Sequence, residues 1–385
     1  MVSKSKRNIE NSSFGSTFSH HLLHPEISLE RHVRSKVLET ADRVLRLKRI
    51  YLDTRYWVDL CEVHLGRARN SVYEELLETL THLVRAGQAI CPINANIFAE
   101  VLKQRDDKTR LATAELIDEL ALGIAIQPED ERIGTEIHHC FLRSQLGDDP
   151  LEPLERLVWT SVSYLLGYTF PIFDGIGEAE MLAAQKSLTD DFWNIPFSQQ
   201  ILMLGQAPSE FDRSWDRIAE KINRETQKHG GTPKSFKQVQ VDEFVGYLDG
   251  YIETMRQIMG RVTSQALGLR TSDYSELASE DDARMLIRIF REAFRKGTLK
   301  NQLPSVVVKS GLYAAIRWNR ARLYKGNDLH DFGHASAALS YYDYFATDAG
   351  LHHLITNELR FDEKYGVTVF ADAHEFLREL RTIAG

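Results

Sequence analysis

Four acidic residues in two distant parts of the chain have types and positions that suit a metal site. Asp53 follows the apolar segment "RIYL", and Glu100 lies within "NIFAEVLKQ". Asp331 precedes the small residues of "FGHASAAL", and Asp348 follows "YDYFAT". Carboxylates gathered at one place repel each other unless a cation neutralises them. Oxygen ligands favour hard cations, so this set would select Mg²⁺ or Mn²⁺, the ions that serve phosphoryl chemistry.

The elements expected around these acids would bring them to one edge of a sheet. Strands are expected at 49–53, 88–93, 123–128, 342–347 and 365–370, and helices at 25–48, 71–87, 94–104, 109–122, 329–340, 350–359 and 373–380. This alternation predicts the α/β fold class, with a mostly parallel central sheet covered by helices. Such sheets carry functional groups at the carboxyl ends of their strands. Asp53 and Asp348 end strands there, and Glu100 and Asp331 lie in the first turns of helices.

The pattern divides the chain into four parts. Residues 1–24 are polar and lack the apolar region of a secretory signal, so we expect a disordered or loosely ordered N-terminus. Residues 25–128 and 326–385 would form the two halves of the α/β domain. Residues 129–325 show almost only helical patterns and no internal repeat, which predicts a large all-α insertion between the halves.

Composition narrows the class of protein. The chain has 385 residues and a net charge of −8, so binding to nucleic acid would need local basic patches rather than bulk attraction. No apolar run is long enough to cross a membrane, and no membrane partner is expected. The three cysteines form no CxxC pair, which favours a cytoplasmic protein with reduced thiols. Neither a P-loop nor a GxGxxG motif is present, so no ATP-binding loop is expected.

Polar neighbours of the four acids could support them. Thr54 and Thr347 adjoin two of the acids and could orient carboxylates or a bound water. His334 lies one turn after Asp331, where it could contact a phosphate or pair with that acid. Asp328 competes with Asp331 for the third acidic position, and would otherwise cap the helix or act as a supporting metal ligand.

Each acid also has a structural alternative. Asp53 could end a strand and enter a turn, and Glu100 could be an exposed helix residue. Asp328 and Asp331 could be an N-terminal cap pair that interacts with the helix dipole, and Asp348 could cap the following helix. The metal-site interpretation therefore depends on the acids as a set and not on any one of them.

A basic and aromatic segment directly precedes Asp331. Its cations are Arg317, Arg320, Arg322 and Lys325, interleaved with Trp318 and Tyr324. Cations can hold phosphates and aromatic rings can stack on bases, so this segment, together with Arg55, is the expected nucleic-acid-binding surface. The alternative is a solvated helix with Trp318 in the core.

The segments "YLDTRYW", "NIFAEVLKQ", "DFGHASAAL" and "FATDAG", in this order, resemble a PIN-like nuclease domain of the PIN/FEN-like superfamily. The resemblance is strongest in 48–128 and 327–382. It implies a three-layer α/β/α core and a catalytic, metal-binding set formed by the four acids. Two features depart from the family: Arg55 replaces a small polar residue, and the gap between Glu100 and Asp331 is far longer than a compact domain needs.

The resemblance implies a metal-dependent endoribonuclease that uses Mg²⁺ or Mn²⁺ to hydrolyse RNA, acting as a toxin, in defence or in RNA processing. RNA is the expected partner, with DNA as an alternative, and a homo-oligomer or a regulatory protein could also bind. The rival functions are a structure-specific DNA nuclease and an inactive nucleic-acid-binding scaffold. A phosphatase of the haloacid dehalogenase type is disfavoured, because Arg55 stands where that chemistry needs a second aspartate.

Overall fold

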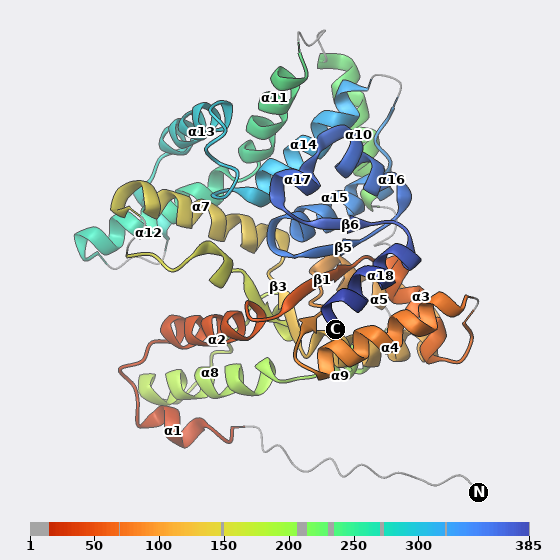
Figure 1. The fold of residues 1–385 in the computed structure, drawn as a ribbon. Helices are drawn as coiled ribbons and strands as arrows, with labels where there is room; N and C mark the ends of the chain where they lie inside the picture. Colours follow the sequence, from red (N-terminus) through yellow and green to blue (C-terminus); the bar gives the residue numbers. More distant parts are fainter. Residues whose placement is uncertain are drawn as a thin grey trace, which may run out of the picture.

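A parallel four-stranded sheet lies at the centre of the protein (Figure 1). The computed structural model describes residues 15–68, 70–147, 150–205, 214–229, 235–269, 273–319 and 322–384. The strand order is β2-β1-β5-β6, with bounds β1 (Lys48–Leu52), β2 (Ala89–Ile90), β5 (Tyr344–Ala346) and β6 (Thr368–Phe370). The mixed α/β class and the parallel pairing predicted from the alternation are therefore confirmed.

The pairing of β1 with β5 joins the two halves of the α/β domain, which are far apart in the sequence. Tyr51 is paired with Phe345 and Leu52 with Ala346, all in parallel register. Arg49 fixes the start of this pairing, since its Nη2 atom donates to Asp343 Oδ1 at 2.8 Å and its backbone N–H donates to Asp343 Oδ2 at 2.8 Å. Burial raises the pKa of the Asp343 carboxyl, but the hydrogen bonds and charge of Arg49 outweigh burial and leave it below its usual value.

Helices cover both faces of the sheet because the buried residues of β1 alternate between two cores. Ile50 and Leu52 belong to one core, which is formed with α3 (Thr54–His64), α4 (Ser71–Arg85), α5 (Ala95–Lys103), α6 (Asp107–Ala121), α9 (Phe197–Leu204) and α18 (Ala373–Ala384). Tyr51 belongs to the other core, which is formed with α2 (Leu29–Val44), α10 (Ser214–His229), α14 (Pro304–Trp318), α15 (Gly326–Tyr341), α16 (Ala349–His353), the following π-helix (Leu354–Leu359) and α17 (Phe361–Tyr365). Helix α3 was not expected from the sequence.

One edge of the sheet differs from the prediction. Strand β3 (Ile124–Ile126) meets the chain after β2 through a parallel bridge between Ile93 and Ala125. Its other side pairs antiparallel with β4 (Trp159–Ser161), which lies in the segment expected to be all-α. All three residues of β4 are buried, so the segment shows no polar alternation that would mark it as a strand.

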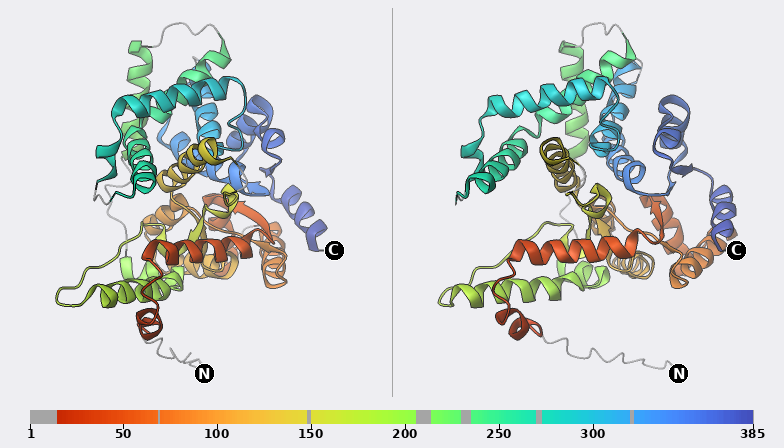
Figure 2. Two further views of the ribbon diagram at one scale, coloured as in Figure 1. Left: turned by 90° about the vertical axis from the view of Figure 1, so that its left-hand side faces the viewer. Right: turned by 60° about the vertical axis from the view of Figure 1, so that its left-hand side comes forward.

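The rest of the insertion consists of helices and loops over the described residues and has an apolar core of its own. Its helices not yet given are α7 (Glu129–Leu146), α8 (Glu178–Trp193), α11 (Phe236–Asp249), α12 (Ile252–Leu267) and α13 (Glu280–Arg295), with 3-10 turns at Leu154–Arg156, Val162–Tyr164 and Tyr274–Leu277. Ile137 of α7, Phe244 of α11 and Ile287 of α13 belong to this core. Figure 2 shows these helices beside the sheet domain.

The N-terminal part is more ordered than its composition predicts. Residues 15–24 are folded and include α1 (Phe18–Leu22), which packs on α8, as does α2 (Figure 2). The buried Lys186 of α8 donates to the backbone oxygens of His24 and Ile27 at 2.8 and 3.1 Å. These partners are more than 150 residues apart, so local composition gives no sign of them. Residues 1–14 lie outside the described part of the chain.

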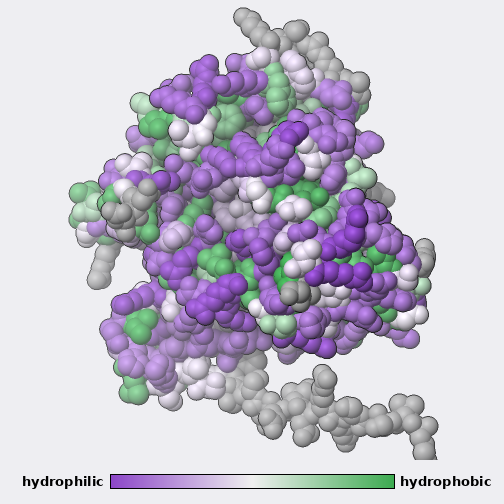
Figure 3. Space-filling model, in the orientation of Figure 1, coloured by the Kyte–Doolittle hydropathy of each residue, from purple (hydrophilic) through white to green (hydrophobic). Residues whose placement is uncertain are grey.

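The surface is mostly hydrophilic on the face drawn in Figure 3, with apolar residues in small separate groups. Among the described residues, no helix has the length and apolar character that a membrane span requires.

The Arg49–Asp343 pair gives a test of the fold. Asp343→Ala should reduce the free energy of unfolding by about 2 kcal/mol, because it leaves a largely buried guanidinium without its partner. Glu292→Ala, which removes the exposed partner of Arg295 at 3.5 Å, should cost less than about 0.5 kcal/mol. Urea titrations of both variants make the comparison. Equal losses would contradict the role given to Asp343.

Candidate metal centre

Asp53 lies at the carboxyl end of β1 and begins α3. Its side chain accepts a hydrogen bond from the backbone N–H of Tyr56 at 3.4 Å, so it does cap the helix. Its own N–H donates to the Ala346 oxygen at 3.0 Å, which ties this end of β1 to β5. Burial raises the pKa of Asp53 to about 6, and the charge of Asp348 adds to the rise, whereas the Thr347 hydroxyl and the Tyr56 N–H oppose it.

Asp348 lies beside Asp53 because of the strand register. Leu52 is paired with Ala346, so the residues after these two leave the sheet at the same edge. Asp348 Oδ1 accepts hydrogen bonds from the N–H groups of Gly350 at 2.6 Å and Leu351 at 3.2 Å. The helix-cap alternative therefore holds for Asp348 as it does for Asp53. A cap occupies part of a carboxylate and does not prevent it from binding a cation.

Glu100 is turned inward, so its alternative as an exposed helix residue is wrong. It lies in the second turn of α5, whose N-terminus is capped by Asn94 through the Ile97 N–H at 3.0 Å. Burial raises the pKa of Glu100 to about 7, and the charge of Asp53 contributes to the rise. Within the described part of the chain no donor forms a hydrogen bond with its buried Oε2 atom. An acid held in this way has an unused ligand atom.

Asp331 lies one turn deeper in its helix than expected. Helix α15 begins at Gly326, so Asp331 is in the second turn, and Asp328 takes the first-turn position. Burial raises the pKa of Asp331 to about 8, with further contributions from Asp348, Asp328, Asp53 and Glu100 in that order. The negative charges of all the other proposed acids therefore act on this one carboxyl group.

Asp328 has the contacts of a structural cap. Its Oδ1 atom accepts from Arg322 Nη2 at 2.7 Å, and its Oδ2 atom accepts from the Lys325 N–H at 2.8 Å. Both oxygens are thus engaged within the protein. The structure favours Asp331 over Asp328 as the third acid of the set and gives Asp328 a supporting position.

His334 is too deeply buried to meet a phosphate. Its side chain is 4% exposed, and its Nδ1 atom lies 2.6 Å from the Tyr51 hydroxyl. Its Nε2 atom lies 3.8 Å from Glu100 Oε2, so its acidic neighbour is Glu100 and not Asp331 as expected. Burial lowers the pKa of His334 to about 3, which keeps the ring neutral. At 3.8 Å the Nε2 atom is too far from Glu100 for a hydrogen bond, so His334 is a neutral neighbour of this acid.

His330 is a neighbour of the acids that the sequence interpretation missed. Its Nδ1 atom lies 3.9 Å from Glu100 Oε1, and its ring packs against Trp215 of α10 with 4.9 Å between centroids. Two histidines four residues apart in "HDFGH" lie on one helix face on either side of Asp331. That spacing was the signal available in the sequence.

The predicted threonines and basic residues differ in their hydrogen bonds and in their exposure. Thr54 has a buried hydroxyl without a hydrogen bond to described residues, whereas the Thr347 hydroxyl acts on Asp53. Arg317 donates to Glu243 of α11 at 2.6 Å. Arg55 and Lys325 are exposed.

The expected nucleic-acid-binding segment is therefore smaller than predicted. Arg317 and Arg322 are engaged in ion pairs with Glu243 and Asp328. Arg320 lies outside the described residues, so the prediction for it stands. Tyr324 is buried and donates to the Tyr313 oxygen at 2.8 Å, which removes it as a stacking residue. Trp318 is 45% exposed, so the alternative that placed it in the core is wrong.

Asp53, Glu100, Asp331 and Asp348 lie in one region of the protein, but their carboxylate oxygens do not converge on a single point. The charge of Asp53 acts on Glu100 and Asp331, and that of Asp348 acts on Asp53 and Asp331. However, within the described ranges the only three acidic, histidine or cysteine side chains with ligand atoms all within 4.8 Å of one another are His21, His32 and Asp190. A cavity of about 920 Å³ also lies elsewhere, among α2, α7 and α12. We call the end of the sheet that carries these four carboxyl groups the acidic edge. Its acids are neighbours but do not form a closed ligand set.

No protein-family model, no curated protein and no solved structure matches this chain. Its function is therefore inferred from the arrangement of its own residues.

Asp331 gives a stability test without added metal. Its folded-state pKa of about 8 lies above its ordinary value of 3.8, so ionisation favours the unfolded state. That cost is absent below about pH 4 and is complete above about pH 8. A rise of about four pKa units would correspond to about 6 kcal/mol before any discount for solvent screening. With a chelator present, Asp331→Asn should therefore be more stable than the unaltered protein at pH 8 by at least about 2 kcal/mol, and nearly equal at pH 4. Urea unfolding at both pH values checks this, with Asp249→Asn as the exposed control.

Proposed function

We propose that the protein is a metal-dependent endoribonuclease with a three-layer α/β/α core of the PIN-like class. The observation that carries the proposal is the β1–β5 register, which brings Asp53 and Asp348 to one edge of the sheet. The raised pKa of Asp331, to which Asp53, Glu100 and Asp348 contribute, supports it. Acids this close raise one another's pKa values and destabilise the fold unless a cation offsets their charge. Sites that keep such a cost are candidates for function.

The donor set fits Mg²⁺ or Mn²⁺. Asp53, Glu100, Asp331 and Asp348 offer only carboxylate oxygens, and the buried Oε2 atom of Glu100 has no hydrogen bond from the described residues. A cation bound by these acids would supply charge stabilisation for the phosphodiester and lower the pKa of a bound water. Asp328 would support it from the cap of α15, and Thr54 and Thr347 would orient the two strand-end acids.

The protein's own residues have separable tasks in hydrolysis. A water oxygen attacks phosphorus, the bond from phosphorus to the 3′ oxygen breaks, and the departing oxygen takes a proton, which leaves 5′-phosphate and 3′-hydroxyl ends. Glu100, with a pKa raised to about 7, can accept or hold a proton near neutral pH. Neutral His334 adds no positive charge beside Glu100, so it does not oppose the raised pKa of this carboxyl group. Exposed Lys325, and Arg55 with its long 3.8 Å ion pair to Asp59, are cations that could contact the phosphates beside the acids.

A second candidate is a nucleic-acid-binding scaffold that has lost catalysis. The observation in its favour is that, among the described residues, no three of the proposed acids have oxygens within 4.8 Å of one another. A structure-specific DNA nuclease would use the same acids, and comparison of RNA and DNA substrates separates the two activities.

Substitution of the acids tests catalysis. Asp53→Asn and Asp331→Asn should each lower the rate of RNA cleavage with Mn²⁺ by about 100-fold or more, since each removes one charge from the proposed metal site. Asp249→Asn, on the exposed end of α11, should cleave at the unaltered rate. Undiminished cleavage by the first two variants would end the site assignment. If the unaltered protein binds RNA but cleaves neither RNA nor DNA, the scaffold is the better account.

Metal binding should also depend on pH. Asp331, with a pKa of about 8, and Glu100, at about 7, must lose protons before they can act as ligands. Mn²⁺ affinity should therefore rise between about pH 6 and pH 8. Calorimetry at pH 7 in two buffers of different ionisation enthalpy should show net proton release, and less of it for Asp331→Asn. Binding without proton release would contradict ligation by these groups.

A further inference from the structure

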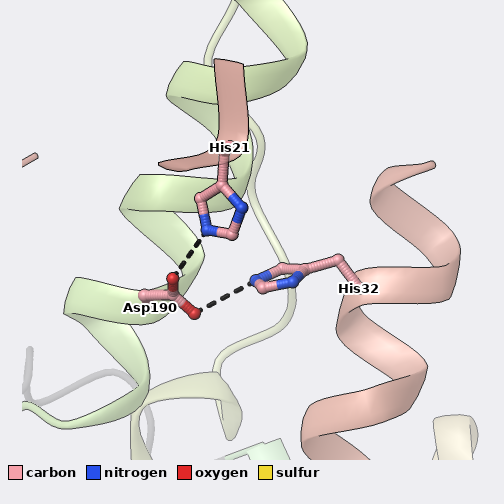
Figure 4. Close-up of side chains that lie close together, drawn as sticks. All are labelled: His21, His32 and Asp190. Carbon is pink, nitrogen blue, oxygen red and sulfur yellow. Dashed lines mark hydrogen bonds and ion pairs between the residues drawn. The ribbon is translucent and has the colours of Figure 1, made fainter. Parts of the chain in front are cut away.

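Two histidines from the N-terminal part converge on one aspartate far from the acidic edge. His21 Nε2 of α1 lies 2.7 Å from Asp190 Oδ2 of α8. His32 Nε2 of α2 lies 3.1 Å from the other oxygen, Oδ1, of the same carboxylate. Figure 4 shows both rings directing a nitrogen at this group from two different helices. The side chains are 8%, 13% and 13% exposed, so the three groups meet in a largely desolvated place.

Their spacing is close to that of a zinc site. All three ligand atoms lie within 4.8 Å of one another. Tetrahedral zinc with bonds of 2.0–2.1 Å holds its ligand atoms roughly 3.3 Å apart. Side-chain adjustments of about 1 Å would therefore suffice. Two imidazole nitrogens and one carboxylate oxygen suit Zn²⁺ and are a poor set for Mg²⁺, which demands oxygen.

Two further donors already contact the aspartate. Lys36 Nζ lies 2.8 Å from Asp190 Oδ1, and Thr17 Oγ1 donates to Oδ2 at 2.9 Å. The hydroxyl is neutral and is compatible with a bound ion. The ammonium is a competing cation, because a zinc ion at the same carboxylate would repel it. The Lys36 side chain is 24% exposed and stands at the end of a flexible stem, so it can turn toward solvent.

We propose that His21, His32 and Asp190 form a zinc site that fastens α1 and α2 to α8. A water completes the coordination, and Lys36 takes the place of the ion when none is bound. The sequence carries a supporting pattern, since four histidines occur between positions 20 and 32, at His20, His21, His24 and His32. The site shares no residue with the acidic edge, so it does not depend on the proposed nuclease activity.

Zinc titration of the full chain tests the proposal. Calorimetry and metal analysis after dialysis should give one Zn²⁺ per chain, and zinc should raise the midpoint of thermal unfolding. His21→Ala and His32→Ala should each weaken binding at least tenfold and abolish the thermal shift. His20→Ala is the matched control, because it lies on the same helix and forms no bond to Asp190 among the described contacts; it should bind as the unaltered protein does.

Lys36→Met separates a zinc site from a purely hydrogen-bonded clamp. Removal of the competing ammonium should tighten zinc binding several-fold, while the same change in a clamp would only lower metal-free stability. The titration is repeated in the Asp331→Asn background, where retained binding excludes the acidic edge as the source of the signal. The proposal is overturned if zinc binding is equal in His21→Ala and the unaltered protein, if it is lost in Asp331→Asn, or if Lys36→Met fails to tighten it.

Discussion

The parallel pairing of β1 with β5 is the contact on which the rest of the structure depends. It joins strands almost 300 residues apart and sets their register through Leu52 and Ala346. The Arg49–Asp343 pair fixes the same register at the opposite end of the strands. Because parallel strands deliver their next residues to one edge of the sheet, this register also makes Asp53 and Asp348 neighbours. A slip of one residue would turn every side chain of β1 to the other core.

At the acidic edge, the same side chains cap helices and form part of the group of carboxylates. Asp53 and Asp348 each cap a helix, and the negative charge of each helps to raise the pKa of Asp331. Capping positions the carboxylates with backbone N–H groups, which cannot leave as a side-chain partner can. Glu100 has no such cap, and its Oε2 atom lies 3.8 Å from His334 Nε2, too far for a hydrogen bond. Its buried Oε2 atom therefore has unused ligand capacity.

The insertion and the N-terminal helices contribute order rather than acids. Strand β4 forms a two-stranded antiparallel sheet with β3, which a single bridge joins to the chain after β2, and α8 provides the surface on which α1 and α2 pack. Helix α10 reaches the acidic edge, where Trp215 lies against His330. The segment 129–325, which interrupts the α/β pattern in the sequence, therefore contacts β3, the N-terminal helices α1 and α2, and the acidic edge in the folded protein.

The sequence by itself determined the α/β class, most of the helices and the strands whose carboxyl ends carry Asp53 and Asp348. Those features follow from local periodicity and from residue type. Tertiary structure decided what no local pattern records: that β4 is a strand, that residues 15–24 fold on α8, and that α15 starts early enough to make Asp328 a cap. It also decided that Tyr324 is buried and that His330 lies beside Glu100. Burial and charge coupling also depend on residues that are distant in sequence, such as Asp53 and Asp348, so they appear only once the chain has folded.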